Sequence, residues 1–381
     1  MPRTSLPLKN PKPNVSRFLD IIRGKIKPQR PPLIDLKVDR AVMKPIVIEL
    51  LNRRWVNLEM LSFPALFNAR PQPPLDRADE IAAWDNFVEF WYRLGYDAIR
   101  FEVGMIFPRI AQTAADDTMT NRERRWADLG EGVIVDWESF EEYPWPKLED
   151  VNFFPLEYVS SHLPEGMGLF ISHAAGVFEH VSELVSFEKL CYLLYDDFEF
   201  VRAVCDRIGE LMESFYRQVI DFPHICAIFP GDDMGFRTST LISPQALREL
   251  FLPWHARFAK IAHDSDLSFY FHSCGDVYNL MPDLINTVNI DAKHSFEDAI
   301  LPVEEFLRQY GDRVGALGGL DVGYLSQHTP EEVKVYVREK IERCTPYSKF
   351  AVGTGSSVTS YIPPQNYLAM LEAVLGTADS P

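Results

Sequence analysis

Short apolar runs rich in β-branched and aromatic residues alternate with longer segments of helical periodicity along most of the chain. Eight of these runs are predicted strands: Pro32–Val38, Ala98–Val103, Leu169–His173, Ile225–Phe229, Ser268–His272, Ile290–His294, Arg313–Leu317 and Phe350–Val352. Helices are predicted at Glu80–Leu94, Phe187–Asp221, Pro244–His263, Pro282–Thr287, Val303–Tyr310, Glu331–Arg343 and Pro364–Val374. Strands that alternate with helices pair in parallel through crossover connections. Eight such units favour an α/β fold, a single (β/α)8 TIM barrel, over a doubly wound open sheet.

One long segment, residues 104–168, interrupts this rhythm between the second and third predicted strands. Connections inside α/β units usually have about two to six residues, so this one is predicted to be an insertion, a lid over the mouth of the barrel. A decorative insertion or an oligomer contact is the alternative. Its aromatic residues either line an apolar pocket or form a small core of their own: Trp126, Trp137, Phe140, Tyr143 and Trp145. Residues 1–16 are predicted to be a flexible N-terminal segment, and residues 17–381 the barrel.

The composition is that of a globular protein, with 46% hydrophobic residues and 24% charged residues among 381. The formal charge of −17 argues against nucleic acid or an anionic membrane surface as a partner and favours a small molecule or another protein. The five cysteines are widely spaced and form no CxxC pair, as is usual in a reducing cytosol. No run reaches the roughly 18 apolar residues of a membrane span, and the first thirty residues resemble no signal peptide. We therefore expect a cytoplasmic protein.

A histidine and a cysteine at the end of the fifth predicted strand are the strongest candidates for chemistry. In extended chain His272 and Cys274 point to the same side, and Gly275 then lets the backbone turn away. An imidazole and a thiolate suit Zn²⁺, and His294, at the end of the next strand, is the predicted third ligand. Three protein ligands and one open position are typical of a catalytic zinc. A buried cysteine beside a core histidine, with no metal, is the alternative.

Other polar residues at the strand ends are candidates for catalysis and substrate binding. Asp232 and Asp233 follow the fourth run, and because adjacent side chains diverge we expect at most one to face the site. Alternatively, such an aspartate caps a turn. Substrate contacts are predicted for His173, Glu179, Arg237, Asp321 and Thr354, the last within a Gly353-Thr354-Gly355 turn that could present amides to an anion.

Several motifs together resemble the uroporphyrinogen-decarboxylase-like superfamily, over roughly residues 16–375. They are Tyr143-Pro144-Trp145-Pro146, Gly231-Asp232-Asp233-Met234-Gly235-Phe236, Phe271-His272-Ser273-Cys274-Gly275-Asp276-Val277, Asp291-Ala292-Lys293-His294-Ser295-Phe296-Glu297-Asp298, Leu317-Gly318-Gly319-Leu320-Asp321-Val322 and Gly353-Thr354-Gly355-Ser356-Ser357-Val358. The resemblance implies a (β/α)8 barrel. True uroporphyrinogen decarboxylases carry an Arg-Gln-Ala-Gly-Arg motif near the N-terminus, where this chain has Asp35-Leu36-Lys37-Val38-Asp39-Arg40. Their late Gly-His-Gly is replaced by Gly353-Thr354-Gly355.

A second branch of the superfamily contains zinc methyltransferases that work with corrinoid proteins, and the motifs are closer to this branch. Its pattern is His-x-Cys, an acidic ligand about two dozen residues later, and a cysteine near the last strand. His272 and Cys274 match the first element, His294 stands at the acidic position, and the late cysteine is replaced within Gly353-Thr354-Gly355.

The resemblance implies a methyltransferase that moves a methyl group from a small substrate to the corrinoid (cobalamin) of a partner protein. Methoxylated aromatics and methylamine-like donors are the candidates, and the aromatic residues of the insertion favour an aryl methyl ether. Zinc would act as a Lewis acid, and Asp232 or Asp233 would position the substrate or its leaving group. No corrinoid-binding Asp-x-His-x-x-Gly pattern is present, so the corrinoid would come from the partner. Barrels of this kind often pair, so a homodimer is possible. The alternatives are a metal-independent decarboxylase of the uroporphyrinogen decarboxylase type, in which Asp232 or Asp233 would stabilise a positive charge, and a binding barrel without catalysis.

Overall fold

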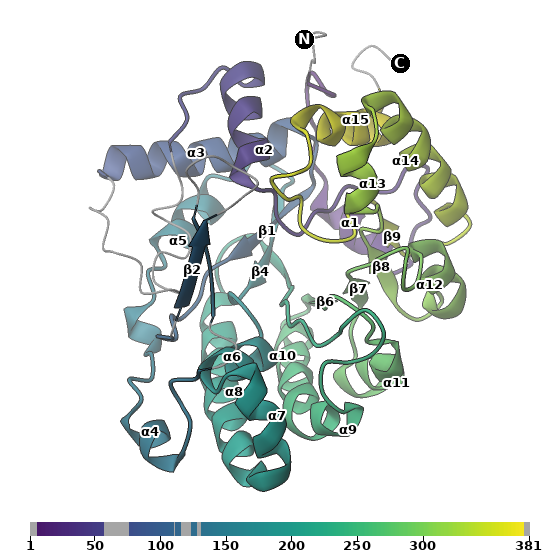
Figure 1. Cartoon of the computed structure of the whole chain (residues 1–381). Helices are drawn as coiled ribbons and strands as arrows, with labels where there is room; N and C mark the ends of the chain where they lie inside the picture. The colour runs from purple at the N-terminus through teal and green to yellow at the C-terminus, as the bar shows by residue number, and fades with distance from the viewer. Residues whose placement is uncertain (1–5, 57–75, 110, 116–122, 128–130, 377–381) are drawn as a thin grey trace.

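Seven parallel strands form one curled sheet at the centre of the molecule. The computed structural model describes residues 6–56, 76–109, 111–115, 123–127 and 131–376. The strands follow the order β1-β4-β5-β6-β7-β8-β9, so each pairs with its neighbours in sequence. Figure 1 shows this succession around the centre of the fold. Their bounds are Ala98–Glu102 (β1), Gly168–Ser172 (β4), Ile225–Ile228 (β5), Ser268–His272 (β6), Ala292–His294 (β7), Gly315–Leu317 (β8) and Phe350–Ala351 (β9). This is the predicted TIM-barrel class of fold.

The first predicted strand, Pro32–Val38, is not a strand of this sheet. The segment lies beside β9 and forms isolated parallel bridges there, from Leu33 to Val352 and from Val38 to Val358. A bend at Leu36 separates the two bridges, and Pro32 has no N–H group to donate to a ladder. The segment therefore occupies the eighth position of the barrel without the regular pairing of a strand.

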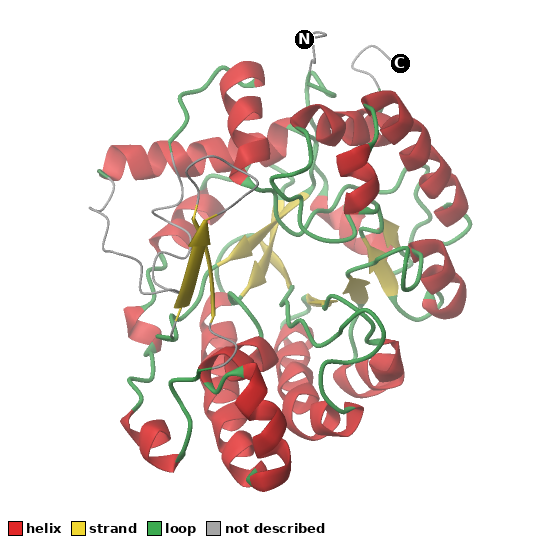
Figure 2. Ribbon diagram, in the orientation of Figure 1, coloured by secondary structure: helices red, strands yellow, loops and turns green. Residues whose placement is uncertain are grey.

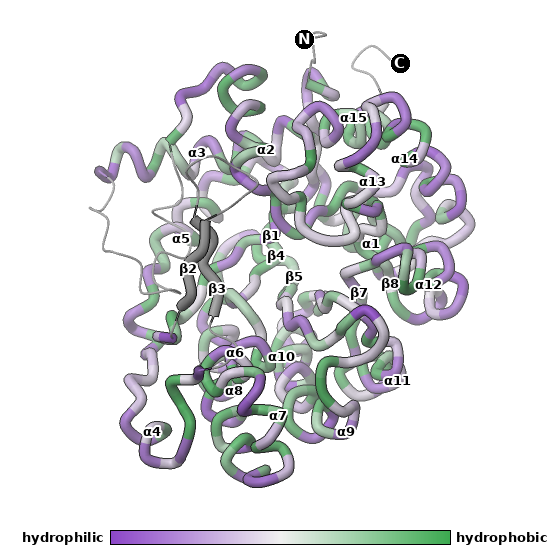
Figure 3. Tube along the Cα trace, in the orientation of Figure 1, coloured by the Kyte–Doolittle hydropathy of each residue, from purple (hydrophilic) through white to green (hydrophobic). Residues whose placement is uncertain are grey.

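Helices surround the strands on the outside, as Figure 2 shows. The α-helices are Val15–Ile22 (α1), Arg40–Pro45 (α2), Arg77–Arg93 (α3), Trp137–Glu142 (α4), Phe154–Ser161 (α5), Val177–Leu184 (α6), Phe187–Asp196 (α7), Phe198–Val219 (α8), Pro244–Ala246 (α9), Leu252–Asp264 (α10), Met281–Asp283 (α11), Val303–Tyr310 (α12), Val322–Gln327 (α13), Pro330–Cys344 (α14) and Pro364–Leu375 (α15). Short π-helical turns cover Ile46–Leu50, Leu247–Phe251 and Leu284–Val288, and 3-10 turns cover Leu148–Asp150 and Tyr278–Leu280. Figure 3 shows apolar and polar residues alternating along the outer helices.

The predicted helix Phe187–Asp221 is two helices, α7 and α8, because the chain breaks at Asp197. This residue has φ −148° and ψ 73°, outside the helical region, and its carboxylate accepts a hydrogen bond from the amide of Phe200. An aspartate that bonds to the third residue after it is a typical N-cap, so the second helix begins there.

Helix α1 closes the barrel at the N-terminal ends of the strands. Its buried Phe18 packs against Phe170 and Tyr270 inside the sheet, with ring centroids 5.2 and 6.5 Å apart. The Arg23 guanidinium that follows the helix donates to the hydroxyl of Ser268, the first residue of β6. This end is filled by apolar side chains, and in barrels of this class a substrate binds at the opposite, C-terminal end of the strands.

The segment between β1 and β4 holds an antiparallel hairpin, β2 (Ala111–Ala115) with β3 (Glu123–Ala127), and then α4 and α5. Trp137, Phe140, Tyr143 and Trp145 pack on one another and on Phe200 of α8, which is the small core that the sequence left as an alternative to a pocket. The side chain of Trp126 lies outside the described residues. Among the described helices, none is long and apolar enough to cross a membrane.

Candidate active site

Three potential metal ligands meet where β5 and β6 end: a carboxylate, an imidazole and a thiol. The ligand atoms of Asp233, His272 and Cys274 all lie within 4.8 Å of one another. The Nε2 atom of His272 is 3.3 Å from Oδ1 of Asp233 and 3.4 Å from Sγ of Cys274. His272 is almost fully buried, whereas 41% of the Asp233 side chain is exposed, so the group is reached from the surface.

The chain brings these residues together by folding two loops against each other. The Asp232 amide donates to the His272 carbonyl, and the Cys274 amide donates to Oδ1 of Asp233 at 2.8 Å. Gly275 has φ +74°, and a Cβ atom there would lie 2.4 Å from the carbonyl carbon of Gly235. Only glycine permits both this backbone conformation and this approach. The sharp turn expected after Cys274 therefore holds Asp233 beside the His-x-Cys pair.

The electrostatics of the group favour a bound cation. Burial works against a charge on Asp233, yet its contacts with His272 and the Cys274 amide hold the pKa of its carboxyl well below the usual range. Burial and the neighbouring Asp233 carboxylate raise the pKa of the Cys274 thiol far above its usual value. A thiolate at this position therefore needs a compensating positive charge, which a metal ion supplies.

The donor set also fits zinc geometrically. In a tetrahedral site with ligand distances of about 2.0–2.3 Å, neighbouring donor atoms lie roughly 3.3–3.6 Å apart. The two separations from His272 Nε2, 3.3 Å to Asp233 and 3.4 Å to Cys274, fall in this range. Carboxylate, imidazole and thiolate are all ligands of Zn²⁺, and three of them leave a fourth position for a substrate. The residues present can therefore hold a catalytic zinc.

His294, the predicted third ligand, stands behind this group and not within it. It pairs with His272 in the register of β6 and β7, and its Nδ1 atom lies 2.7 Å from Nδ1 of His272. Its Nε2 atom donates to the carbonyl oxygen of Thr354 at 3.1 Å. Because both ring nitrogens are engaged, the third member of the group is Asp233 in place of His294.

The two adjacent aspartates point in different directions. The buried Asp232 carboxylate accepts hydrogen bonds from the amides of Phe178 and Glu179, at 3.1 and 3.0 Å, and pairs with Nε2 of His255 at 2.7 Å. It therefore anchors the N-terminus of α6, where the helix dipole favours a negative charge. Asp233 alone faces the candidate ligands.

The residues predicted to contact a substrate divide into two kinds. Three of them stabilise the fold. Both ring nitrogens of His173 form hydrogen bonds with the backbone, and Asp321 caps α13 by accepting a hydrogen bond from the Tyr324 amide. The amide and the hydroxyl of Thr354 both donate hydrogen bonds to Asp35. The Thr354 amide is therefore not open to an anion.

The other two predicted substrate residues remain near the open end of the barrel. Arg237 is exposed in the loop after β5. Glu179 is the third residue of α6 and accepts from the Gly176 amide at 3.1 Å. Burial, together with the negative charges of Asp233 and Asp232, raises the pKa of the Glu179 carboxyl well above its usual value.

Sequence reasoning missed buried polar residues within the first two predicted strands. Asp35 is buried and accepts hydrogen bonds from Thr354, Tyr96 and Tyr367. Arg100 is also buried, donates to Ser172 at 2.8 Å and forms an ion pair with Glu102. Glu102 ends β1, so the rule that selected Asp233 and His272 would have found it. Asp35 lies in the middle of the run Pro32–Val38, where that rule does not apply.

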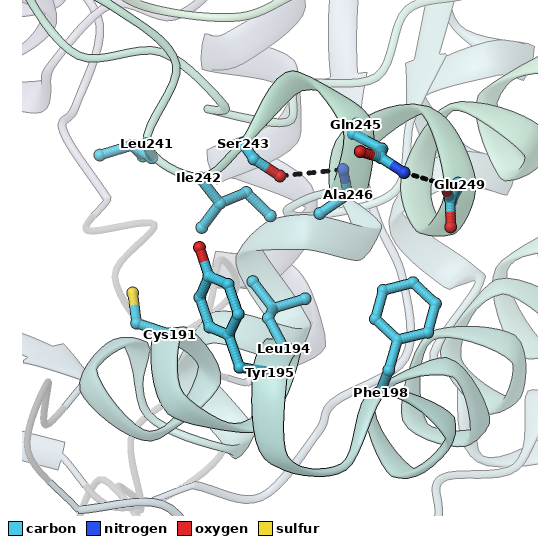
Figure 4. Close-up of a pocket in the computed structure, with 10 residues that line it drawn as sticks. All are labelled: Cys191, Leu194, Tyr195, Phe198, Leu241, Ile242, Ser243, Gln245, Ala246 and Glu249. Atoms are coloured by element: carbon cyan, nitrogen blue, oxygen red, sulfur yellow. Dashed lines mark hydrogen bonds between the residues drawn. The ribbon is translucent and has the colours of Figure 1, made fainter.

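A groove of about 500 Å³ opens beside the same loop, between α7, the start of α8 and the start of α9. Its lining mixes apolar and polar side chains, among them Tyr195, Phe198, Gln245 and Glu249 (Figure 4). The amide of Leu241, in its wall, donates to the carbonyl of Met234, which directly follows Asp233. The backbone that positions Asp233 therefore also shapes this groove.

Comparison with known proteins identifies the family to which this chain belongs. The sequence pattern of the uroporphyrinogen decarboxylase (URO-D) family matches residues 156–376, which is more than half of the chain. A methylated-thiol–coenzyme M methyltransferase of Methanosarcina mazei is 28% identical over 242 residues, which are 61% of this chain and 61% of that relative. The chain thus matches less than two thirds of the relative's length. A solved structure of a methyltransferase from Methanosarcina mazei superposes with a TM-score of 0.64 at 13% identity, covering 95% of this chain and 98% of that chain, and this likeness shows the fold. The chain therefore belongs to the uroporphyrinogen decarboxylase (URO-D) family.

Proposed function

We propose that this protein is a methyltransferase that uses zinc held by Asp233, His272 and Cys274. The observation that carries the proposal is the convergence of these three donors, within 4.8 Å of one another, at the open end of the barrel. The 28% identity to a methyltransferase of Methanosarcina mazei supports the reaction class. Zinc, when bound, would supply a Lewis acid that stabilises negative charge as it develops on a leaving oxygen.

The proposed substrate is an aryl methyl ether, and the methyl group passes to the corrinoid of a partner protein. The bond between the methyl carbon and the ether oxygen breaks, the methyl group goes to the partner's nucleophile, and the electron pair stays on the aryl oxygen. The groove beside the Asp233 loop carries the aromatic side chains of Tyr195 and Phe198, which can pack on an aromatic ring. Because the chain has no Asp-x-His-x-x-Gly pattern, the corrinoid is assigned to the partner. We expect this reaction in the cytoplasm.

The protein's own groups prepare the site for this reaction. Asp232 anchors α6 and thereby fixes the position of Glu179. Burial and the neighbouring Asp233 and Asp232 carboxylates raise the pKa of Glu179 and so favour its neutral form, and a neutral carboxyl can donate a hydrogen bond to an uncharged ether oxygen. We therefore assign Glu179 to substrate positioning.

A metal-independent decarboxylase is supported less well by the same residues. A substrate with several carboxylates needs cations that are free to bind it. Arg100, a buried cation of β1, is occupied by Glu102, Ser172 and the Phe229 carbonyl. Asp232 would stabilise a positive charge in that reaction, but its carboxylate already accepts hydrogen bonds from the start of α6 and from His255.

The test compares purified wild-type protein with Cys274→Ala. We expect one zinc per wild-type chain by elemental analysis, and methyl transfer from a methoxybenzoate to free cob(I)alamin, followed by absorbance. Cys274→Ala should lose the zinc and at least about 100-fold in rate, because a ligand is gone. Cys226→Ala, which removes a thiol of β5 outside the group, is the matched control. Zinc at background in the wild type, or full activity of Cys274→Ala, would contradict the proposal, and metal-free turnover of uroporphyrinogen would favour the decarboxylase.

A further inference from the structure

A line of hydrogen bonds leads from the candidate metal group into the wall of the barrel. Nδ1 of His272 and Nδ1 of His294 are 2.7 Å apart, and Nε2 of His294 lies 3.1 Å from the carbonyl oxygen of Thr354. His294 is fully buried, and its ring also meets the ring of Phe229 edge to face. The strands β6 and β7, which carry the two histidines, are neighbours in the sheet (Figure 1).

The position of each proton along this line follows from what each partner can do. A carbonyl oxygen only accepts, so Nε2 of His294 must carry a hydrogen. A fully buried imidazole that contacts another imidazole, a carbonyl and a phenyl ring keeps its neutral form, which leaves a lone pair on Nδ1 of His294. The hydrogen between the two rings therefore belongs to Nδ1 of His272. In the neutral ring of His272 the remaining lone pair is then on Nε2, the atom that faces Asp233 and Cys274.

The far end of the line is fixed to the fold by Asp35. Its Oδ1 atom accepts from the amide and the hydroxyl of Thr354, at 2.8 and 2.7 Å. Its Oδ2 atom accepts from Tyr96 and Tyr367. From the other side Gly318 approaches so closely that a Cβ atom would lie 2.3 Å from the Thr354 oxygen and 3.0 Å from the His294 ring. The carbonyl that orients His294 therefore has little freedom to move.

We propose that His294 is a positioning residue that holds His272 in the Nδ1–H tautomer and so aims the Nε2 lone pair at the point between Asp233 and Cys274. Asp35, through Thr354, is the anchor of this arrangement. The inference rests on the proposed function, because a lone pair at Nε2 matters when zinc binds there. A hydrogen bond from the second nitrogen of a ligand histidine typically changes metal affinity about 10- to 100-fold.

The tautomer itself is tested without metal. Wild-type protein labelled with ¹⁵N-histidine and treated with a chelator is studied by NMR, in which the ¹⁵N shifts and two-bond couplings to the ring protons identify the protonated nitrogen. The spectrum of His272→Asn assigns the signal. We expect the ring of His272 to carry a hydrogen on Nδ1. The reverse tautomer, or a mixture of the two, would overturn the inference even where zinc binds.

The effect on zinc is tested with two substitutions of His294. His294→Leu removes the acceptor, and we expect the Kd for zinc, measured by competition with a chromophoric chelator, to rise about 10- to 100-fold. His294→Asn places an amide oxygen near the position of Nδ1 and should recover most of the affinity. His180→Leu is the matched control, since His180 is equally buried and its contacts are with Phe107, His173 and Arg109.

The outcomes separate this inference from the proposed function. Wild-type affinity in His294→Leu, or equal losses in His294→Leu, His294→Asn and His180→Leu, would overturn the positioning role. If His294→Leu does not fold, the Asn variant and the wild-type tautomer decide. A wild type that binds no zinc would refute the proposed metal, while the tautomer measurement would still decide whether His294 orients His272.

Discussion

Two strand ends of this barrel each carry a buried histidine, and the two rings are used in opposite ways. His173 follows β4; its Nδ1 donates to the Ala174 carbonyl at 2.9 Å and its Nε2 accepts from the Met105 amide at 3.0 Å. His272 ends β6 and bonds to His294 through Nδ1, while its Nε2 faces Asp233 and Cys274. A ring whose nitrogens are both satisfied by the backbone stabilises the fold, whereas a ring with one nitrogen among other ligands can bind a metal.

The adjacent aspartates divide in the same way between the two strand ends. Asp232 turns to the β4 side, where it holds the start of α6, and Asp233 turns to the β6 side, where it joins the ligands. Position at a strand end therefore identifies candidates for function. The hydrogen bonds that each side chain already makes decide which candidates are still available for a ligand.

The strongest test of this difference between the two strand ends is to replace each aspartate in turn. Asp232→Ala would leave two amides of α6 and the ring of His255 without their acceptor in a buried place. We expect a loss of about 3–5 kcal/mol in the free energy of unfolding, measured with urea on the metal-free protein. Asp233→Ala, whose side chain is 41% exposed, should cost about 1 kcal/mol or less and instead weaken zinc binding. Equal stability losses, or zinc affinity lost in both variants, would show that the two strand ends are not distinct.

The pH dependence of stability tests whether His173 is a structural residue. Burial lowers the pKa of His173 from 6.5 to about 4. In the unfolded chain this histidine gains a proton below about pH 6.5, and in the folded protein only near pH 4. Stability from the neutral ring is therefore present above pH 6.5 and is lost as the pH falls toward 4. Relative to a His173→Phe variant, the metal-free wild type should lose about 2–3 kcal/mol across this window in urea titrations. A difference between the two proteins that does not change with pH would contradict the assignment.

The sequence predicted the sheet well because parallel strands buried on both sides are continuous apolar runs. Seven of the eight predicted strands are present, and β6 has the predicted bounds. Pro32–Val38 has the composition of a strand, but its bend at Leu36 depends on contacts with residues more than 300 positions away. The break at Asp197 was readable, since an aspartate before an apolar run is a common N-cap.

The candidate site was predicted in part, and the missing part depends on ring orientation. His-x-Cys on one strand follows from the alternation of side chains, so His272 and Cys274 were found together. The spacing of adjacent strands also placed His294 correctly beside His272. Whether the His294 ring joins the ligands or stands behind them depends on the Thr354 carbonyl, 60 residues away. The membership of Asp233 depends likewise on two loops meeting at Gly235 and Gly275, which no periodicity reveals.

A smaller loss of stability than that of Asp232→Ala is expected from a substitution of His173 itself at neutral pH. His173→Phe removes the acceptor of the Met105 amide in a fully buried position, and we expect a loss of about 2 kcal/mol in the free energy of unfolding. His173→Gln, which places an amide oxygen near the position of Nε2, should recover part of this loss. Zinc affinity and the KM for the methyl donor should stay at wild-type values in both variants, because the ring contacts neither the ligands nor the open end. A stable His173→Phe protein with a raised KM would instead restore His173 as a substrate contact, and buried histidines at the other strand ends would then have to be reconsidered as parts of the site.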